Sequence, residues 1–389
     1  AGASQLTRAG YFVDEEFTAF AVRGIQADGL PLLPSGLLYD RGLAYSYASW
    51  FAGAVSGSTL PAYRALSLLS ALASVLLVFA IVRRLTTERA ALLAATLVSL
   101  SLPFWATATT GRFYAPFLAV YLFGLFLLML VHQHGVTRRT VVSLVAVAAI
   151  GRWLHELEFT FVGIPFLCAV LGSRVDRRKW LVATAALAAG LIAAQGTLFA
   201  LHALEPSSGE TMVRRFFLWQ VLNLFEVPGD RQYGLVLTLM VVAWVLVPKR
   251  AALTAGVALS GVAMVLAFSL ARATNFGPLN TATVATLLAD GATYPLDMFR
   301  HLAVAYPVLT VVALASLVAR LAGAGGEWRP HERAAHVLWL LWVLWFGVID
   351  SGITTNYLLL PVTCISIAIA IDVDAIVSHS LPPLSVSTR

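Results

Sequence analysis

The chain has 389 residues, of which 59% are hydrophobic and only 12% are charged, and its mean hydropathy is +0.82. A soluble domain carries about 25% charged residues, so this composition excludes a soluble enzyme. The formal net charge is +6, but the basic residues are scattered between apolar runs, which argues against nucleic-acid binding. We therefore expect an all-α polytopic membrane protein, because backbone inside a membrane must satisfy its own hydrogen bonds.

The first notable feature along the chain is a group of three acidic residues, Asp14, Glu15 and Glu16. They precede the polar and aromatic segment 39–47, which leads into the first apolar run. A carboxylate cluster beside a membrane surface indicates chemistry at the boundary between water and lipid. Aspartate is also a good helix N-cap, so an alternative is that Asp14 only caps a helix starting near Glu15.

The rest of the chain is a series of apolar segments. Crossing the ~30 Å hydrocarbon core takes about 20 residues of helix, and we predict about eleven spanning helices, of which the fourth, fifth and seventh are short. The predicted spans are residues 62–82, 90–110, 113–131, 140–153, 157–172, 180–201, 234–248, 251–271, 302–321, 333–349 and 353–371.

Alternating these spans places most of the arginines on one side of the membrane, which the positive-inside rule assigns to the cytoplasm. Residues 1–61 then form a first extracytoplasmic loop, and residues 62–372 a transmembrane domain with external loops near 202–233 and 272–301. Residues 373–389 form a cytoplasmic tail. Because the chain starts with Ala1 and residues 1–10 are too short and polar to span, we expect a first helix, or a cleaved signal peptide, upstream.

Several short motifs occur in a fixed order along this topology. They are the acidic pair, the segment Arg41-Gly42-Leu43-Ala44-Tyr45-Ser46-Tyr47, the helix end Arg83-Arg84, Gly111-Arg112-Phe113-Tyr114, Leu154-His155-Glu156 and Asn356-Tyr357-Leu358-Leu359-Leu360-Pro361. This series resembles the GT-C superfamily of integral-membrane glycosyltransferases, in the branch of protein O-mannosyltransferases and lipid A aminoarabinose transferases. The resemblance covers about residues 11–170 and, weakly, the last helix.

The resemblance implies a GT-C-like fold in the plasma (inner) membrane with its active face outside. It implies transfer, with inversion, of a sugar from a polyprenyl-phosphate donor to an acceptor that is a protein, a lipid or a polysaccharide. Membrane lipids and subunits of a membrane complex are the other expected partners, and no cofactor is expected beside the lipid-linked sugar. Asp14 matches the family's acidic position and is the expected general base, with Glu15 as its orienting neighbour or alternate.

Arginines are the candidates for binding the donor phosphate, because guanidinium grips phosphate with a bidentate fork. Arg112 is the first choice, since it lies at the predicted external end of a helix. The alternative is an arginine that snorkels to the interface beside Phe113 and Tyr114. Arg214 and Arg215 are secondary candidates, in a mixed basic and aromatic segment that resembles an amphipathic surface helix.

The remaining candidates for the substrate groove are Arg41, Tyr45, His155, Glu156 and Glu158. His155 and Glu158 are three residues apart and would share a helix face, where they could bind sugar hydroxyls, assist the base or ligate a cation. The alternatives are interfacial polar residues and, for Tyr45, aromatic anchoring at the interface. We predict no essential metal, because the acidic group lacks the Asp-x-Asp spacing of the metal-dependent relatives.

Two other classes of function stay open. A non-catalytic GT-C-like scaffold subunit would explain why Ala115 and Asn356 stand where relatives carry an acid and an arginine, respectively. A transporter is less consistent with the sequence, because transporters place charged or broken helices at mid-membrane and show a repeat between halves. Here the acids cluster at the predicted outer edge and no internal repeat is visible.

Overall fold

The computed structural model describes residues 14–57, 59–155, 157–171, 174–204, 302–329, 331–336, 338–340 and 358–380. These residues are mostly helical and contain no strand, only an isolated β-bridge between Leu32 and Leu38. The expected all-α class is therefore confirmed for this part of the chain. The chain divides into two compact units, Ala1–Ile81 with Ser99–Trp219, and Val82–Val98 with Gln220–Arg389.

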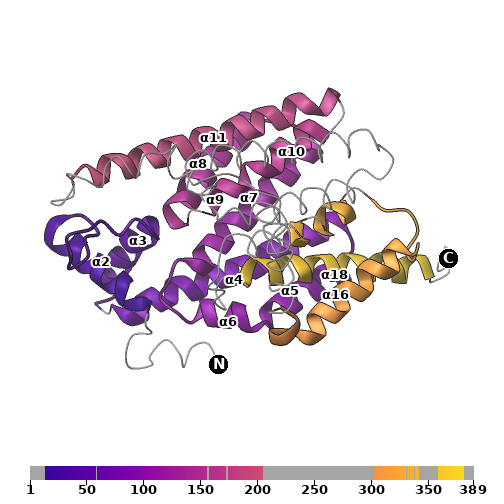
Figure 1. Cartoon of the computed structure of the whole chain (residues 1–389), viewed down its shortest axis with the longest axis horizontal. Helices are drawn as coiled ribbons and strands as arrows, with labels where there is room; N and C mark the ends of the chain where they lie inside the picture. The colour runs from indigo at the N-terminus through magenta and orange to yellow at the C-terminus, as the bar shows by residue number, and fades with distance from the viewer. Residues whose placement is uncertain are drawn as a thin grey trace, which may run out of the picture. The chain divides into compact units, whose positions relative to one another are not determined.

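The first unit carries most of the described helices. In chain order they are α2 (Glu15–Asp28), α3 (Leu43–Ser56), α4 (Leu60–Leu85, whose last turn belongs to the second unit), α6 (Leu102–Ala108), α7 (Tyr114–His134), α8 (Arg138–Leu154), α9 (Glu158–Phe161), α10 (Gly163–Leu171) and α11 (Arg174–His202). Helices α8 and α11 pack side by side, α7 packs on α8, and α2 packs on α3 (Figure 1).

The second unit contains α5 (Glu88–Ser99), α16 (Pro307–Leu321) and α18 (Leu359–Ser380). Helices α16 and α18 pack against each other (Figure 1). At the start of α5 the hydroxyl of Thr87 donates to the carboxylate of Asp374 on α18. Helix α18 continues past residue 372, where the sequence predicts the cytoplasmic tail to begin.

Four described helices are long and apolar enough to cross a membrane: α4, α7, residues Asp176–His202 of α11, and residues Leu359–His379 of α18. They confirm an integral, multi-pass membrane protein and agree with the spans predicted at 62–82, 113–131, 180–201 and 353–371. The segments 234–248 and 251–271 lie outside the described residues, and 333–349 lies mostly outside them. The count of eleven spans stays a prediction.

Two predicted spans are broken. Helices α5 and α6 are long enough to cross a membrane only together, and they are bent by 64° at their junction, so the predicted span 90–110 is not one continuous helix. Pro103 lies in the first turn of α6, where proline fits, but it cannot donate a hydrogen bond to a continuous helix. The segment 157–172 is also divided, into the four-residue α9 and the nine-residue α10.

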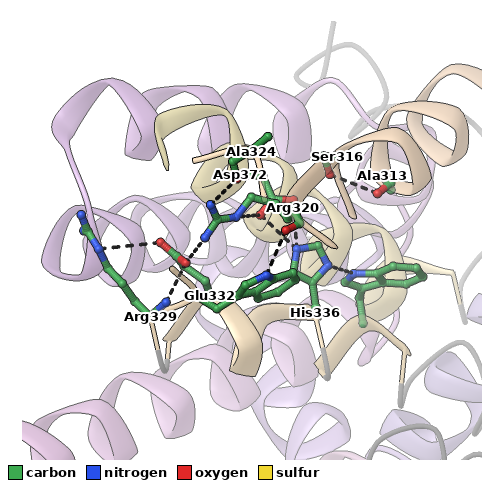
Figure 2. A network of polar contacts seen from close by, with 10 residues as sticks. Ala313, Ser316, Arg320, Ala324, Arg329, Glu332, His336 and Asp372 are labelled. Carbon is green, nitrogen blue, oxygen red and sulfur yellow. Dashed lines mark hydrogen bonds and ion pairs between the residues drawn. The ribbon is translucent and has the colours of Figure 1, made fainter. Parts of the chain in front are cut away.

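A buried polar network joins α16, α18 and the segment 331–336 in the second unit (Figure 2). Arg320 is fully buried and donates to the carboxylate of Glu332, and its Nε lies 3.8 Å from Oδ1 of Asp372. His336 Nε2 lies 2.9 Å from Oδ2 of Asp372, and the indole of Trp339 donates to His336 Nδ1 at 3.1 Å. Because Nδ1 of His336 accepts a hydrogen bond, the ring hydrogen lies on Nε2, which donates it in a hydrogen bond to the Asp372 carboxylate.

Close packing of α8 on α11 depends on a small residue. A Cβ atom at Gly190 of α11 would lie 2.3 Å from the carbonyl oxygen of Val145 and 2.9 Å from Cβ of Ala148 on α8. A Cβ atom at Gly196, six residues further along α11, would meet no atom within 4 Å. Alanine substitutions at the two glycines therefore separate the effect of the α8–α11 contact on stability from the effect of helix propensity.

We expect Gly190→Ala to destabilise the first unit, because the new methyl group must push α8 away from α11, at a cost of about 1–3 kcal/mol. Gly196→Ala is the matched control and should be neutral or slightly stabilising, since alanine is favoured over glycine in helices by about 1 kcal/mol. The measurement is the thermal unfolding midpoint of both purified variants in detergent. Equal midpoints would contradict the packing argument.

We expect Arg320→Met to lower the unfolding midpoint strongly, because it removes the buried cation that pairs with the carboxylates of both Glu332 and Asp372. Breaking such a pair costs about 3–5 kcal/mol. Arg329→Met is the control, since Arg329 also approaches Glu332, at 3.8 Å, but its side chain is 63% exposed, and exposed pairs contribute only about 0–1 kcal/mol. A similar small shift in both variants would show that the network contributes little.

Candidate functional site

A buried ion pair holds the start of α2 against α4. The Glu15 carboxylate accepts hydrogen bonds from Arg64 Nε at 2.9 Å and from Arg64 Nη2 at 2.7 Å. The two side chains are only 0% and 4% exposed. Oε1 of Glu15 also accepts from the backbone N–H of Gly111 at 2.5 Å. One carboxylate therefore fixes three segments that lie far apart in the sequence.

Further hydrogen bonds fix the backbone that leads into α7. The Thr18 hydroxyl on α2 donates to the Gly111 carbonyl at 3.1 Å, and the Ser67 hydroxyl on α4 donates to the Arg112 carbonyl at 2.9 Å. Tyr45 is buried, and its hydroxyl donates to the Tyr63 carbonyl at 2.6 Å. These hydrogen bonds satisfy buried polar groups within the protein. They also fix the backbone from which the Arg112 side chain extends.

Arg112 itself is buried but not paired with an acid. Its Nη1 donates to the backbone carbonyl of Asp14 at 2.7 Å and to the Tyr39 hydroxyl at 2.6 Å. Its guanidinium carbon lies 4.8 Å from the ring centroid of Phe113. Within the described part of the chain no carboxylate forms an ion pair with Arg112, and its buried Nε has no hydrogen-bond acceptor. Among the described residues, no acid therefore compensates the positive charge of Arg112.

Asp14 lies directly beside this charge, at the N-cap position of α2. The helix begins at Glu15, as the sequence predicts, but the Asp14 side chain makes no capping hydrogen bond. Asp14 is half-buried, and its carboxylate forms no hydrogen bond or ion pair with any described residue. Capping alone therefore does not account for an aspartate at this position.

Tyr39 is the second hydrogen-bond partner of Arg112, beside the Asp14 carbonyl. Its ring is buried and stacks on Phe17, with the centroids 6.0 Å apart and the planes at 11°. Burial raises the pKa of Tyr39 to about 12, although the positive charge of Arg112 acts in the opposite direction. The hydroxyl therefore stays protonated at neutral pH.

His155 is a neutral, packed side chain. It follows the last residue of α8, and its ring lies against Phe113, Tyr114 and Phe117, at centroid distances of 5.4, 6.1 and 5.2 Å. Its Nδ1 accepts a hydrogen bond from the Leu157 N–H at 3.1 Å. Burial lowers the pKa of His155 to about 3, and nearby arginines lower it further. Its role in the substrate groove stays a prediction, but only an uncharged ring is available for it.

The predicted helix face shared by His155 and Glu158 is wrong. Helix α8 ends at Leu154, His155 has extended backbone, and Glu158 opens the separate helix α9. The Glu158 carboxyl group is buried, and a Cβ atom at Gly151 would lie only 2.4 Å from it. Neither of its oxygens has a hydrogen-bond partner among the described residues. Any contact of Glu158 with a substrate stays a prediction.

The other groove candidates fall into two groups. Arg41 is exposed, and the segment that carries it is docked by the Gly42 N–H, which donates to the Leu154 carbonyl at 3.1 Å. Tyr45 is buried with its hydroxyl bonded inside the protein, so a direct substrate contact by Tyr45 stays a prediction. Glu156, Arg214 and Arg215 lie outside the described residues.

Two important residues of this site were not among the sequence candidates. Arg64 is a lone charged residue inside the first predicted span, and charges inside apolar spans are rare and usually paired or functional. That rule alone could have identified Arg64. Tyr39 has no such signal, because its contact with Arg112 joins residues 73 positions apart.

No group of three or more His, Cys, Asp or Glu side chains is placed to hold a metal ion in the described part of the chain. The absence of an essential metal stays an expectation.

Comparisons with known proteins bear on this site. Residues 40–200 match the family model described as dolichyl-phosphate-mannose-protein mannosyltransferase. No curated protein matches the chain. Two solved structures of ArnT from Cupriavidus metallidurans are similar at 14% identity. The apo structure has a TM-score of 0.43, with 93% of this chain and 72% of that chain covered. The structure bound to undecaprenyl phosphate has a TM-score of 0.47, with 96% and 74% covered.

The matched segment contains Arg41, Arg64, Arg112 and His155, which are residues of the site or its surroundings. It ends before the described helices α16 and α18 begin. The family match over residues 40–200 agrees with the resemblance that the ordered motifs predict.

Proposed function

We propose that the chain is an inverting glycosyltransferase that moves a sugar from a polyprenyl-phosphate donor to an acceptor on the extracytoplasmic face of the plasma membrane. The observation that carries this proposal is Arg112, a buried guanidinium without a carboxylate partner in the described part of the chain. It contacts the backbone of Asp14, whose own carboxylate has no hydrogen-bond partner there. A buried charge needs a counter-charge, and a phosphate at the membrane surface supplies one.

In this proposal Asp14 acts as the general base. Its carboxylate takes the proton from the acceptor hydroxyl while the acceptor oxygen forms a bond to the anomeric carbon of the sugar. The bond between that carbon and the phosphate oxygen breaks on the opposite face, so the configuration at the anomeric carbon is inverted. Polyprenyl phosphate leaves with the electron pair of the broken bond.

Arg112 stabilises the departing phosphate. Negative charge grows on the phosphate as the bond breaks, and a fixed guanidinium in a water-poor site stabilises this charge more strongly than water-exposed arginine can. Nε of Arg112 has no acceptor among the described residues, so it is available as a donor to a phosphate oxygen. The hydrogen bond from Arg112 to the Asp14 carbonyl supports a base and a phosphate site that are adjacent.

Glu15 takes the orienting role and not the role of an alternate base. Its carboxylate already accepts three hydrogen bonds, from two nitrogens of Arg64 and from the Gly111 backbone. Substituting Glu15 would leave Arg64 buried without its partner, so a Glu15 variant tests the fold and not the chemistry. The clean test of the base is a change at Asp14 alone.

We expect Asp14→Asn to reduce sugar transfer by about 10²–10⁴-fold, because the amide cannot accept the proton. The donor lipid should then accumulate on the purified variant. The measurement is mass spectrometry of the lipids that co-purify with the wild type and the variant, followed by addition of acceptor-containing membrane extract to detect release of polyprenyl phosphate.

Glu16→Gln is the matched control, since Glu16 is adjacent and exposed, and it should leave transfer unchanged. Transfer at the wild-type rate by Asp14→Asn would exclude Asp14 as the base. Polyprenyl phosphate or its sugar conjugate in none of the samples would instead favour the scaffold-subunit interpretation. The sugar mass found on Asp14→Asn would identify the donor.

We expect Arg112→Gln to weaken the binding of undecaprenyl phosphate by about 10–100-fold, since hydrogen bonds to charged groups contribute about 1.5–3 kcal/mol. Arg112→Lys should have an intermediate effect, because it keeps the charge but loses the fork. The measurement is native mass spectrometry in detergent, with undecaprenol as the uncharged reference. The control is Arg23→Gln, because Arg23 is an exposed arginine on α2. Equal losses of undecaprenyl phosphate affinity in Arg23→Gln and Arg112→Gln would contradict a specific phosphate contact.

A further inference from the structure

In the described part of the chain, the Tyr39 hydroxyl uses its hydrogen in no hydrogen bond. It accepts a hydrogen bond from Arg112 Nη1 at 2.6 Å, and it donates to no described residue. A phenol carries one donor hydrogen besides its acceptor lone pairs, so this hydrogen has no acceptor among the described residues. Two other tyrosines of the same region differ, since Tyr45 donates to the Tyr63 carbonyl and Tyr47 to the Gly29 carbonyl.

The donor is held in place and stays a donor. Tyr39 is only 8% exposed, its ring stacks on Phe17, and its backbone N–H donates to the Pro31 carbonyl at 2.8 Å. Burial raises the pKa of Tyr39 to about 12, so the hydroxyl keeps its hydrogen under physiological conditions. A buried donor without an acceptor costs free energy, and such a group in a folded protein needs an explanation.

A second unsatisfied donor lies on the residue it contacts. Arg112 Nε is buried without an acceptor in the described part of the chain. The hydrogen bond from Arg112 also polarises the phenol, which makes its hydroxyl a stronger donor. The two side chains together offer two donors and one positive charge. The phosphate group of a polyprenyl-phosphate sugar, with two non-bridging oxygens and a negative charge, satisfies all of them, and so does the polyprenyl phosphate that is released.

We propose that the Tyr39 hydroxyl donates a hydrogen bond to the same phosphate group that Arg112 binds, which makes Tyr39 a substrate-binding residue for the lipid-linked phosphate. The inference rests on the proposed function, because that function supplies the phosphate. It also accounts for the otherwise unexplained buried hydroxyl. Tyr39 thus discriminates a phosphorylated lipid from the free polyprenol.

The test compares Tyr39→Phe with the wild type, using the full chain in detergent. The variant keeps the ring and its stacking on Phe17, and it removes the hydroxyl together with the hydrogen bond that the hydroxyl accepts from Arg112. Native mass spectrometry measures the affinities for a polyprenyl phosphate and for the matching polyprenol. We expect the preference for the phosphate to fall about tenfold, with polyprenol binding and the unfolding midpoint unchanged.

Tyr47→Phe is the control, since it removes a hydroxyl that already donates to a backbone carbonyl, and it should leave the preference unchanged. An unchanged preference in Tyr39→Phe would overturn the inference. Equal losses for the phosphate and the alcohol would also overturn it, because they indicate a general change of the groove. A wild-type protein without any preference for the phosphate would instead overturn the proposed phosphate site of Arg112.

A second variant separates donation to the phosphate from simple support of Arg112. In Tyr39→3-fluorotyrosine the hydroxyl is a stronger donor and a weaker acceptor than in tyrosine. Retained or increased preference for the phosphate supports donation by Tyr39, whereas a loss equal to that of Tyr39→Phe shows that Tyr39 only orients the guanidinium.

An arm with inorganic phosphate identifies the source of the phosphate group: weak binding without the lipid chain supports the lipid donor, and equally tight binding overturns it.

Discussion

The site depends on the buried pair of Glu15 and Arg64. Removing two charges from water is expensive, and their attraction compensates only when the geometry is good and the remaining hydrogen-bonding groups are satisfied. Here both carboxylate oxygens are bonded, and the Gly111 N–H completes the arrangement. Because these contacts join α2, α4 and the turn before α7, the pair determines where the start of α2 lies.

The contacts of Glu15 also position the other residues of the site. The start of α2 carries Asp14, and the turn after Gly111 carries Arg112, so one carboxylate positions both the proposed base and the proposed phosphate ligand. Glu15 is saturated with partners, whereas the carboxylate of Asp14, the Nε of Arg112 and the hydroxyl hydrogen of Tyr39 have none among the described residues. Saturated buried groups stabilise the fold, whereas an unsatisfied buried group needs an explanation, and the proposed function supplies a ligand for those around Arg112.

The second unit shows what a purely structural arginine looks like in this protein. Arg320 is as deeply buried as Arg64 and has carboxylates on two neighbouring segments, Glu332 and Asp372, so its charge is compensated within the protein (Figure 2). Charged side chains in apolar segments are generally paired in this way. Arg112 departs from this pattern, since its described partners are a carbonyl and a phenol and not an acid.

The sequence by itself determined the helical class, the spans that became α4, α7, α11 and α18, the start of α2 beside Asp14, and the residues Asp14 and Arg112 as candidates. These features depend on local properties, namely apolar length, capping residues and charge near a helix end. The tertiary structure decided the break between α5 and α6, the separation of His155 from Glu158, and the contacts of Arg64 and Tyr39. Those contacts join residues 49 and 73 positions apart, and only the packing of α2, α4 and α7 brings them within hydrogen-bond distance.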